Sequence, residues 1–263
     1  MLFINPQWQG SGITNELKIG AETLKLFFKD HDFKEIPLYE KDLESQHNII
    51  AYNSILKQAE FFKTAVIESK AQKIQTVGGD CGIEIIPISY LNEIYKNNLG
   101  IIWIDAHADL NTPESSPSKT FHGMPLRTLL GEGNEEIKKL LFSNIKPQQI
   151  CFVGLRDLDE PEIEYIKLNK IQSVSKCDYA ALEHIIKLYN TIYIHLDLDV
   201  LDESEFKYTM FPTSNGFKID DVYHLIKEIK QKTNVVGMCI TESKAATLEQ
   251  LEPIKKVLEE ILF

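Results

Sequence analysis

The chain has 263 residues, of which 43% are apolar and 25% are charged, the composition of an ordinary globular protein. This length suits one α/β core, so we expect a single domain over residues 1–263. The formal net charge of −11 argues against a surface that binds nucleic acid or an anionic membrane, because both would repel the chain. The first residues have no basic flank, and no apolar run reaches the roughly 20 residues that span a bilayer, so we expect neither a signal peptide nor an anchor.

In chain order, short runs rich in Ile, Val and aromatic residues predict eight strands. They lie at 2–5, 35–39, 74–77, 101–105, 150–154, 171–174, 192–197 and 235–240. The weakest two are 35–39 and 171–174, and Pro37 suggests that the first of them is an edge strand.

Longer stretches with helical spacing separate the strands, notably 13–31, 53–73 and 219–232. In 247–263 one apolar stripe predicts a last helix, with Pro253 tolerated in its first turn; the stripe contains Leu248, Leu251, Ile254, Leu258 and Ile261. This alternation predicts a three-layer α/β fold, in which helices cover both faces of an eight-stranded, mostly parallel sheet. Two irregular segments, 110–125 and 201–217, are long enough to be functional loops.

The four cysteines lie far apart and form no CxxC pair, which argues against a zinc knuckle or a thioredoxin-type site. A reduced, cytoplasmic setting is the simplest interpretation. Cys151 and Cys239 lie inside apolar runs and are expected to be small buried hydrophobes. Cys81 is different, because it directly follows "GGD" where a strand gives way to a helix, a usual place for ligands in α/β proteins.

Acidic residues follow two of the strongest predicted strands. Asp105, His107 and Asp109 are spaced by two, so in an extended segment they project to one side and offer three metal ligands. The alternative is that the aspartate caps the next turn and the histidine is a satisfied core group.

Asp197 and Asp199 repeat this spacing after a second apolar strand, with Asp202 beyond them. Two such carboxylates in an apolar crevice would repel each other unless a cation neutralised them. Four carboxylates and one imidazole suit Mn²⁺ or Mg²⁺ better than structural zinc. Cys81 and Glu242 end two further strands, and the carboxyl ends of parallel strands share one edge of a sheet, so we expect all these groups to meet.

Four motifs together resemble the ureohydrolase family, which contains arginase, agmatinase and formiminoglutamase. They are "GGDCG" (78–82), "DAHADLNTP" (105–113), "FHGMP" (121–125) and "DLDVLD" (197–202). The resemblance runs from the first strand to Glu242 and implies the same fold and a hydrolase that cleaves a C–N bond of a guanidino or formimino substrate. Urea or formamide would be released by a metal-activated hydroxide.

The resemblance also implies a metal centre, since members of the family hold two Mn²⁺ ions joined by a bridging hydroxide. Asp105 and Asp197 would bridge the two ions, Asp109 would complete the first, and His107 with Asp199 would complete the second. Cys81 stands where the first ion normally receives a histidine, and Gly82 replaces the serine that usually follows.

By the same resemblance, His122 matches the family's mobile proton-transfer histidine, and Glu242 matches the acid that grips the guanidinium or amidine group. Asn111, Ser118 and Asp159 fall where arginases contact the amino-acid end of the substrate. Members of the family are often trimers or hexamers, so a homo-oligomer is expected.

The cysteine changes the charge of the predicted site. Four carboxylates balance two divalent ions, whereas a Cys81 thiolate would bring the ligand charge to −5 and weaken the ions as Lewis acids. A softer ion such as Zn²⁺, Fe²⁺ or Co²⁺, or a single ion, then becomes an alternative. Glu203, in place of the proline that often follows the "DLDVLD" motif, bears on substrate selection.

Other functions stay open on the sequence alone. One is a single-metal amidohydrolase that resembles the related deacetylases and uses Asp105, His107 and Asp197. Another is a non-catalytic protein that has kept the fold and lost its first metal site. A nucleophilic Cys81 is a minor alternative, because the carboxylates around it would raise the pKa of the thiol.

Overall fold

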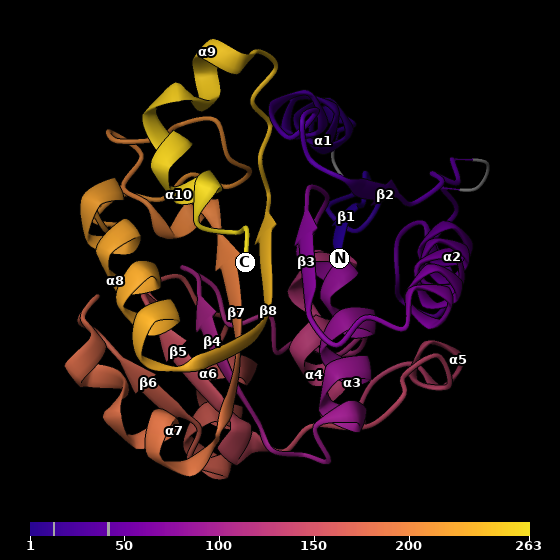
Figure 1. The fold of residues 1–263 in the computed structure, drawn as a ribbon. Helices are drawn as coiled ribbons and strands as arrows, with labels where there is room; N and C mark the ends of the chain where they lie inside the picture. Colours follow the sequence, from indigo (N-terminus) through magenta and orange to yellow (C-terminus); the bar gives the residue numbers. More distant parts are fainter. Residues whose placement is uncertain (13, 41–42) are drawn as a thin grey trace.

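A single sheet organises the protein, and the computed structural model describes residues 1–12, 14–40 and 43–263 of it. Within that part of the chain, eight strands pair in the order β2-β1-β3-β8-β7-β4-β5-β6, and every pair is parallel. The strands are β1 (Leu2–Ile4), β2 (Phe33–Glu35), β3 (Ile74–Val77), β4 (Leu99–Ile104), β5 (Ile150–Val153), β6 (Gln172–Val174), β7 (Thr191–Asp197) and β8 (Asn234–Thr241). The predicted α/β fold is confirmed (Figure 1).

The two weakest predicted strands are the two edges of the sheet. The predicted bounds 35–39 are wrong, because β2 is Phe33–Glu35 and pairs with Leu2–Ile4. Pairing ends before Pro37, which has no N–H to donate to a neighbouring strand. At the opposite edge β6 is only three residues long, so both edges offer little unpaired backbone.

Helices cover both faces of the sheet. Figure 1 shows α8 and α10 on one side of the sheet and α2 and α3 on the other. The helices are α1 (Glu16–Phe27), α2 (Tyr52–Ser69), α3 (Ile85–Ile94), α4 (Pro125–Leu129), α5 (Glu135–Lys138), α6 (Glu160–Asn169), α7 (Glu183–Leu188), α8 (Ile219–Lys232), α9 (Leu248–Leu251) and α10 (Lys255–Glu259). The helical stretch predicted from residue 13 begins at Ile13, which lies outside the described residues. No helix in the described ranges is long and apolar enough to cross a membrane.

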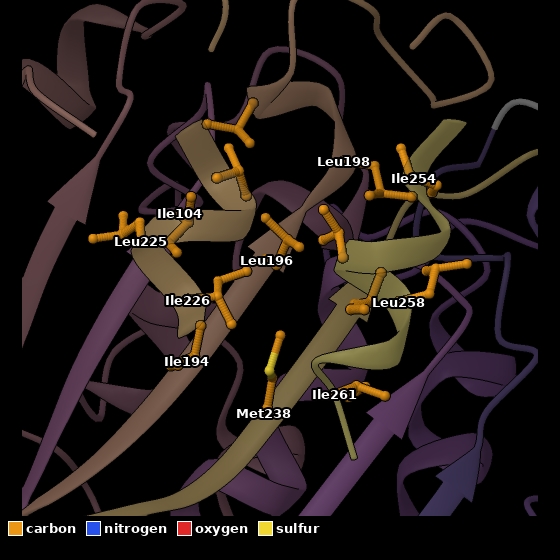
Figure 2. Close-up of a cluster of buried hydrophobic side chains, with 14 of the residues drawn as sticks. Ile104, Ile194, Leu196, Leu198, Leu225, Ile226, Met238, Ile254, Leu258 and Ile261 are labelled. Atoms are coloured by element: carbon orange, nitrogen blue, oxygen red, sulfur yellow. The ribbon is translucent and has the colours of Figure 1, made fainter. Parts of the chain in front are cut away.

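Two apolar layers separate the sheet from these helices. One contains Leu24 of α1 and the buried side chains of α8 and α10, packed on Ile194 and Met238 of the central strands (Figure 2). The other lies under α2 and α3 and contains Trp103 and Tyr193. β4 and β7 are buried along their whole lengths because they have a layer on each side, which explains their continuous apolar runs.

The chain end is less regular than its apolar stripe predicts. α9 and α10 are separated by a 3₁₀ turn, Glu252–Ile254, that contains Pro253, so the prediction of one helix over 247–263 is wrong. Proline has no N–H for the helical hydrogen bond, and its ring crowds the preceding turn. Four of the five stripe residues are buried as predicted, and Ile254, Leu258 and Ile261 are seen in Figure 2, whereas Leu248 is 42% exposed.

The "GGD" turn after β3 depends on two glycines. Gly78 and Gly79 have φ values of +88° and +77°, a region that other residues rarely adopt. A Cβ on Gly79 would lie 2.7 Å from the carbonyl oxygens of both Asn5 and Gln7. The turn therefore fits tightly against the segment after β1, and this contact fixes where Asp80 and the residues after it enter the carboxyl edge of the sheet.

Replacing Gly79 by alanine should destabilise the protein by about 2 kcal/mol or more, because the new Cβ meets backbone in a left-handed conformation. For a chain of this size, the melting temperature of the metal-free protein should fall by about 4 °C or more. Gly123→Ala is the matched control, since a Cβ there meets nothing within 4 Å and φ is not in the left-handed region. Equal melting temperatures for the two variants would contradict this account.

Candidate active site

Four neighbouring strands deliver polar residues to one edge of the sheet. β3, β8, β7 and β4 are adjacent, and their carboxyl ends lead to Cys81, Glu242, Asp197 and Asp105 respectively. Side chains from these segments form three overlapping groups of potential metal ligands, each with its ligand atoms within 4.8 Å of one another. The sequence-based expectation that these segments converge is therefore correct.

Each of three strand-end aspartates also organises its own turn. Asp80 accepts a hydrogen bond from the Gly82 N–H at 2.8 Å, Asp105 from the His107 N–H at 2.7 Å, and Asp197 from the Asp199 N–H at 2.7 Å. Such turns are a known preference of aspartate. The capping alternative for Asp105 thus applies together with its place in the ligand cluster, where its second carboxylate oxygen accepts a hydrogen bond from Trp103 Nε1 at 2.9 Å.

Acidic side chains accumulate at this edge, where histidines are their basic neighbours. Eight acidic side chains are buried, and no Lys or Arg is buried in the described ranges. The eight are Asp80, Glu84, Asp105, Asp109, Glu162, Asp197, Asp199 and Glu242. Buried carboxylates at this density are costly unless a proton or a cation neutralises them.

One group consists of Asp105, His107 and Asp199. His107 Nδ1 lies 2.9 Å from Asp199 Oδ2 and 3.6 Å from Asp105 Oδ1. Burial lowers the pKa of His107, but hydrogen bonds to these two carboxylates outweigh burial and raise this pKa well above its ordinary value. Burial, followed by repulsion from Asp105, raises the pKa of Asp199 to about 7. The group attracts positive charge, and it contains the two residues predicted to complete the second metal together with one predicted bridge.

A second group joins Cys81, Asp105 and Asp109 to His195, a residue that the sequence analysis missed. His195 Nε2 lies 3.8 Å from Cys81 Sγ and 3.6 Å from Asp105 Oδ2. A signal was present, because His195, Asp197 and Asp199 repeat the two-residue spacing of Asp105 and His107. It was overlooked since His195 lies within an apolar strand.

The third group contains Cys81, Asp197 and Glu242. Cys81 Sγ lies 3.1 Å from Asp197 Oδ2, and the Cys81 N–H donates to Glu242 Oε1 at 3.1 Å. Burial, and then repulsion from Asp197 and the neighbouring carboxylates, raises the pKa of the Cys81 thiol well above its ordinary value. A protonated thiol that donates to Asp197 suits these surroundings better than a thiolate.

The donor set fits a divalent cation. Asp109 Oδ2 and Glu242 Oε2 are buried and have no hydrogen-bond partner among the described residues. Both residues hold left-handed backbone conformations, with φ of 53° and 63°. Unpartnered buried oxygens are rare in folded proteins, and left-handed non-glycine residues tend to occur at functional sites. Oxygen-rich ligands of this kind suit Mn²⁺ and Mg²⁺.

His122 lies beside this cluster. Its Nδ1 is 3.7 Å from Glu242 Oε1, and its ring stacks on Phe211 with centroids 5.1 Å apart. Burial lowers the pKa of His122, but the Glu242 carboxylate outweighs this effect and raises it. The imidazole can therefore hold and release a proton close to the acidic cluster. Phe211 was not identified from the sequence, because an aromatic residue in an irregular loop has no local signal.

A cavity of about 390 Å³ opens next to the cluster. His107, Asp109 and His122 line it, as do all three residues predicted to contact the substrate, Asn111, Ser118 and Asp159. Asn111 Nδ2 donates to Asp159 Oδ2 at 2.8 Å, which joins the two loops of the wall.

The structure also shows the contacts of three charged residues in neighbouring loops. Asp157 was not singled out from the sequence, but it lines the cavity and lies 3.5 Å from His107 Nε2. Arg156 holds the 201–217 loop in place, because its guanidinium donates to Thr213 Oγ1 and to the carbonyl oxygen of Asp199. Asp202, the last acid of "DLDVLD", instead accepts hydrogen bonds from Ser204 and Gly216, so it belongs to the loop and not to a ligand group.

Known proteins are similar to this chain in sequence and in fold. Two arginases of Staphylococcus aureus are similar: one (strain MRSA252) is 37% identical over 179 residues, which is 63% of this chain and 58% of that protein. The other (strain COL) is 34% identical over 240 residues, covering 86% of this chain and 74% of the relative. The solved structure of Entamoeba histolytica arginase in complex with L-ornithine superposes with a TM-score of 0.88 at 22% identity, covering 100% and 97% of the two chains, and shows the same fold.

The model of the arginase family matches residues 13–250, from the first helix region to α9. This span contains all four motifs and all four strand ends that build the acidic cluster. The chain therefore belongs to the arginase family of hydrolases.

Proposed function

We propose that this protein is a metal-dependent hydrolase that cleaves a C–N bond of a guanidino or formimino substrate and releases urea or formamide. The observation that carries the proposal is the set of eight buried acids without a buried Lys or Arg in the described ranges, gathered beside an open cavity. The names of the similar Staphylococcus proteins support guanidino chemistry.

The residues that would hold metal follow from the ligand groups. Asp105 belongs to two groups and would contact both ions, Asp109 would serve the first ion, and His107 with Asp199 the second. Asp197 belongs to one group, and its contact with both ions is implied by the family resemblance. Ions bound there supply Lewis acidity, which lowers the pKa of water and so provides a nucleophile near neutral pH. Mn²⁺ suits the oxygen-rich set, and the sulfur of Cys81 keeps Zn²⁺, Fe²⁺ and Co²⁺ as alternatives.

The chain's own groups would bind the substrate. The Glu242 carboxylate, with one unpartnered oxygen, would accept hydrogen bonds from the planar guanidinium or amidine. His122 Nδ1, 3.7 Å from that carboxylate, would give a proton to the departing amine nitrogen. Asn111, Ser118 and Asp159 in the cavity wall would contact the opposite end of the substrate. The acidic wall favours a cationic substrate.

Two alternatives follow from the sequence. A single-metal hydrolase would use Asp105, His107 and Asp197, and a count of bound ions separates it from the two-metal enzyme. A non-catalytic protein would follow from the replacement of histidine by Cys81. The presence of His122 beside Glu242 at the mouth of the cluster favours an enzyme.

The setting of the protein is also a proposal. We infer a homo-oligomer, a trimer or hexamer, from the family resemblance. A cytoplasmic location agrees with four cysteines that are all free thiols.

After loading with Mn²⁺, the protein should release urea from L-arginine or agmatine, or formamide from formiminoglutamate. His122→Asn should lower kcat by about 10²- to 10⁴-fold, the usual effect of removing a general acid or base, and leave the bound manganese unchanged. The control is His184→Asn, at an exposed histidine of α7. Turnover of no substrate by the loaded wild-type protein would refute the catalytic proposal, and full activity of His122→Asn would remove that residue from it.

Metal should also stabilise the fold, because it neutralises the buried carboxylates. Mn²⁺ at about 100 times its dissociation constant adds about 2.7 kcal/mol, which raises the melting temperature by about 5 to 10 °C. Asp199→Asn should lose most of this increase, whereas Asp202→Asn, in the same motif but outside the ligand groups, should keep it. Thermal unfolding with and without Mn²⁺ measures both, and equal shifts in the two variants would speak against the assigned ligands.

A further inference from the structure

A histidine that is not part of the four motifs faces the group of potential metal ligands. His195 lies on β7 two residues before Asp197, and it is 0% exposed. Its Nε2 is 3.6 Å from Asp105 Oδ2 and 3.8 Å from Cys81 Sγ. It shares one potential ligand group with Cys81, Asp105 and Asp109, which are the residues expected around the first ion.

The ring of His195 is held so that this nitrogen faces the cluster. Nδ1 lies 2.7 Å from Glu84 Oε1, and the second oxygen of Glu84 accepts a hydrogen bond from the Tyr193 hydroxyl at 2.5 Å. Trp103, the cross-strand neighbour on β4, stacks on the imidazole with centroids 3.6 Å apart and also donates to Asp105 Oδ2 at 2.9 Å. All these side chains are buried, so the imidazole has one orientation available.

This arrangement is that of a metal-ligating histidine. Such a histidine usually donates its other ring N–H to a carboxylate, which fixes the tautomer and leaves a lone pair directed at the ion. Glu84 accepts at Nδ1, so in the neutral ring the lone pair is on Nε2. The alternative is a core histidine whose two ring nitrogens serve Glu84 and Asp105. The distance of 3.6 Å from Nε2 to Asp105 Oδ2 is too long for a direct hydrogen bond, so this nitrogen is not held by that carboxylate as Nδ1 is held by Glu84.

Charge and chemistry favour His195 over Cys81 as the ligand. A neutral imidazole keeps the ligand charge at −4 against two divalent ions, whereas a thiolate would make it −5. Cys81 then stays a thiol and hydrogen-bonds to Asp197 Oδ2 at 3.1 Å. A neutral imidazole can also bind a divalent transition metal through its lone pair, whereas a neutral thiol is a poor ligand because the thiolate is the form that binds.

We propose that His195 supplies the imidazole of the first metal, displaced from the loop after β3 to strand β7, and that Glu84 is its positioning residue. The inference rests on the proposed function only in needing metal at this cluster. The replacement of histidine by Cys81 therefore moves a ligand and does not remove one. The first site keeps a nitrogen donor, which comes from β7, two strands away from β3 in the sheet, instead of from the turn after β3.

The test counts ions and identifies their nitrogen ligands. Wild-type protein should bind two Mn²⁺ per chain by elemental analysis. Its pulsed electron paramagnetic resonance spectrum, recorded with ¹⁵N-histidine labelling, should show couplings from two imidazole nitrogens, those of His107 and His195. His195→Gln should bind one ion, or bind the first at least 10-fold more weakly, and lose one coupling. The control is His184→Gln, an exposed histidine that should change neither readout.

Two further variants separate the roles of the neighbours. Glu84→Gln should weaken the first ion by about 10- to 100-fold without changing the number of coupled nitrogens, as expected for a residue that acts through His195. Cys81→Ser should keep both ions, and cobalt-loaded wild-type protein should show no thiolate-to-cobalt charge-transfer band. Glu84→Gln also keeps the inference testable if His195→Gln does not fold, which circular dichroism of the metal-free variant would show.

The outcomes distinguish this inference from the proposed function. Two ions and two couplings in His195→Gln, with or without hydrolysis, would overturn the inference and leave the function standing. Loss of an ion in Cys81→Ser together with retention in His195→Gln would also overturn it. Loss of one ion and one coupling in His195→Gln supports the inference even if wild-type protein releases no urea, in which case only the catalytic proposal fails.

Discussion

The structure depends on the concentration of buried negative charge at one edge of the sheet. Two unit charges about 4 Å apart repel by about 4 kcal/mol at an effective dielectric constant of about 20, and eight acids are buried in this region. No Lys or Arg is buried with them in the described part of the chain. The fold can accept this arrangement because the two apolar layers supply stability elsewhere, and because a cation at the cluster would turn repulsion into attraction.

The parallel sheet explains why the acids meet. Every strand runs in the same direction, so the residues that follow β3, β4, β7 and β8 all emerge at one edge. The central position of β4 and β7 brings Asp105 and Asp197 to neighbouring strand ends, each organising its own turn through a backbone N–H. The candidate ligand cluster is thereby built at the ends of fully buried strands, while loop residues line much of the cavity beside it.

Much of this could be predicted from the sequence because the relevant patterns are local. Apolar runs located the strands, and the spacing of Asp105, His107 and Asp109 indicated ligands on one side of an extended segment. Errors arose where tertiary contacts decide. Pro37 ends β2 early, Pro253 divides the last helical segment, and Leu248 is exposed although it belongs to the predicted apolar stripe. His195 was missed, although it shares the two-residue spacing of Asp197 and Asp199, because a histidine inside an apolar strand is more often a core residue than a ligand.

The sequence by itself determined the family, the parallel α/β fold and the acids at the strand ends, since these depend on short motifs and on the period of apolar residues. Only the tertiary structure decided what surrounds Cys81. It placed Asp197 against the thiol and His195 beside it, residues more than 100 positions away in the chain. The physical reason is that these neighbours of Cys81 come from β7, which lies two strands from β3 in the sheet and more than 100 residues away in the chain, so no local pattern gives their distances.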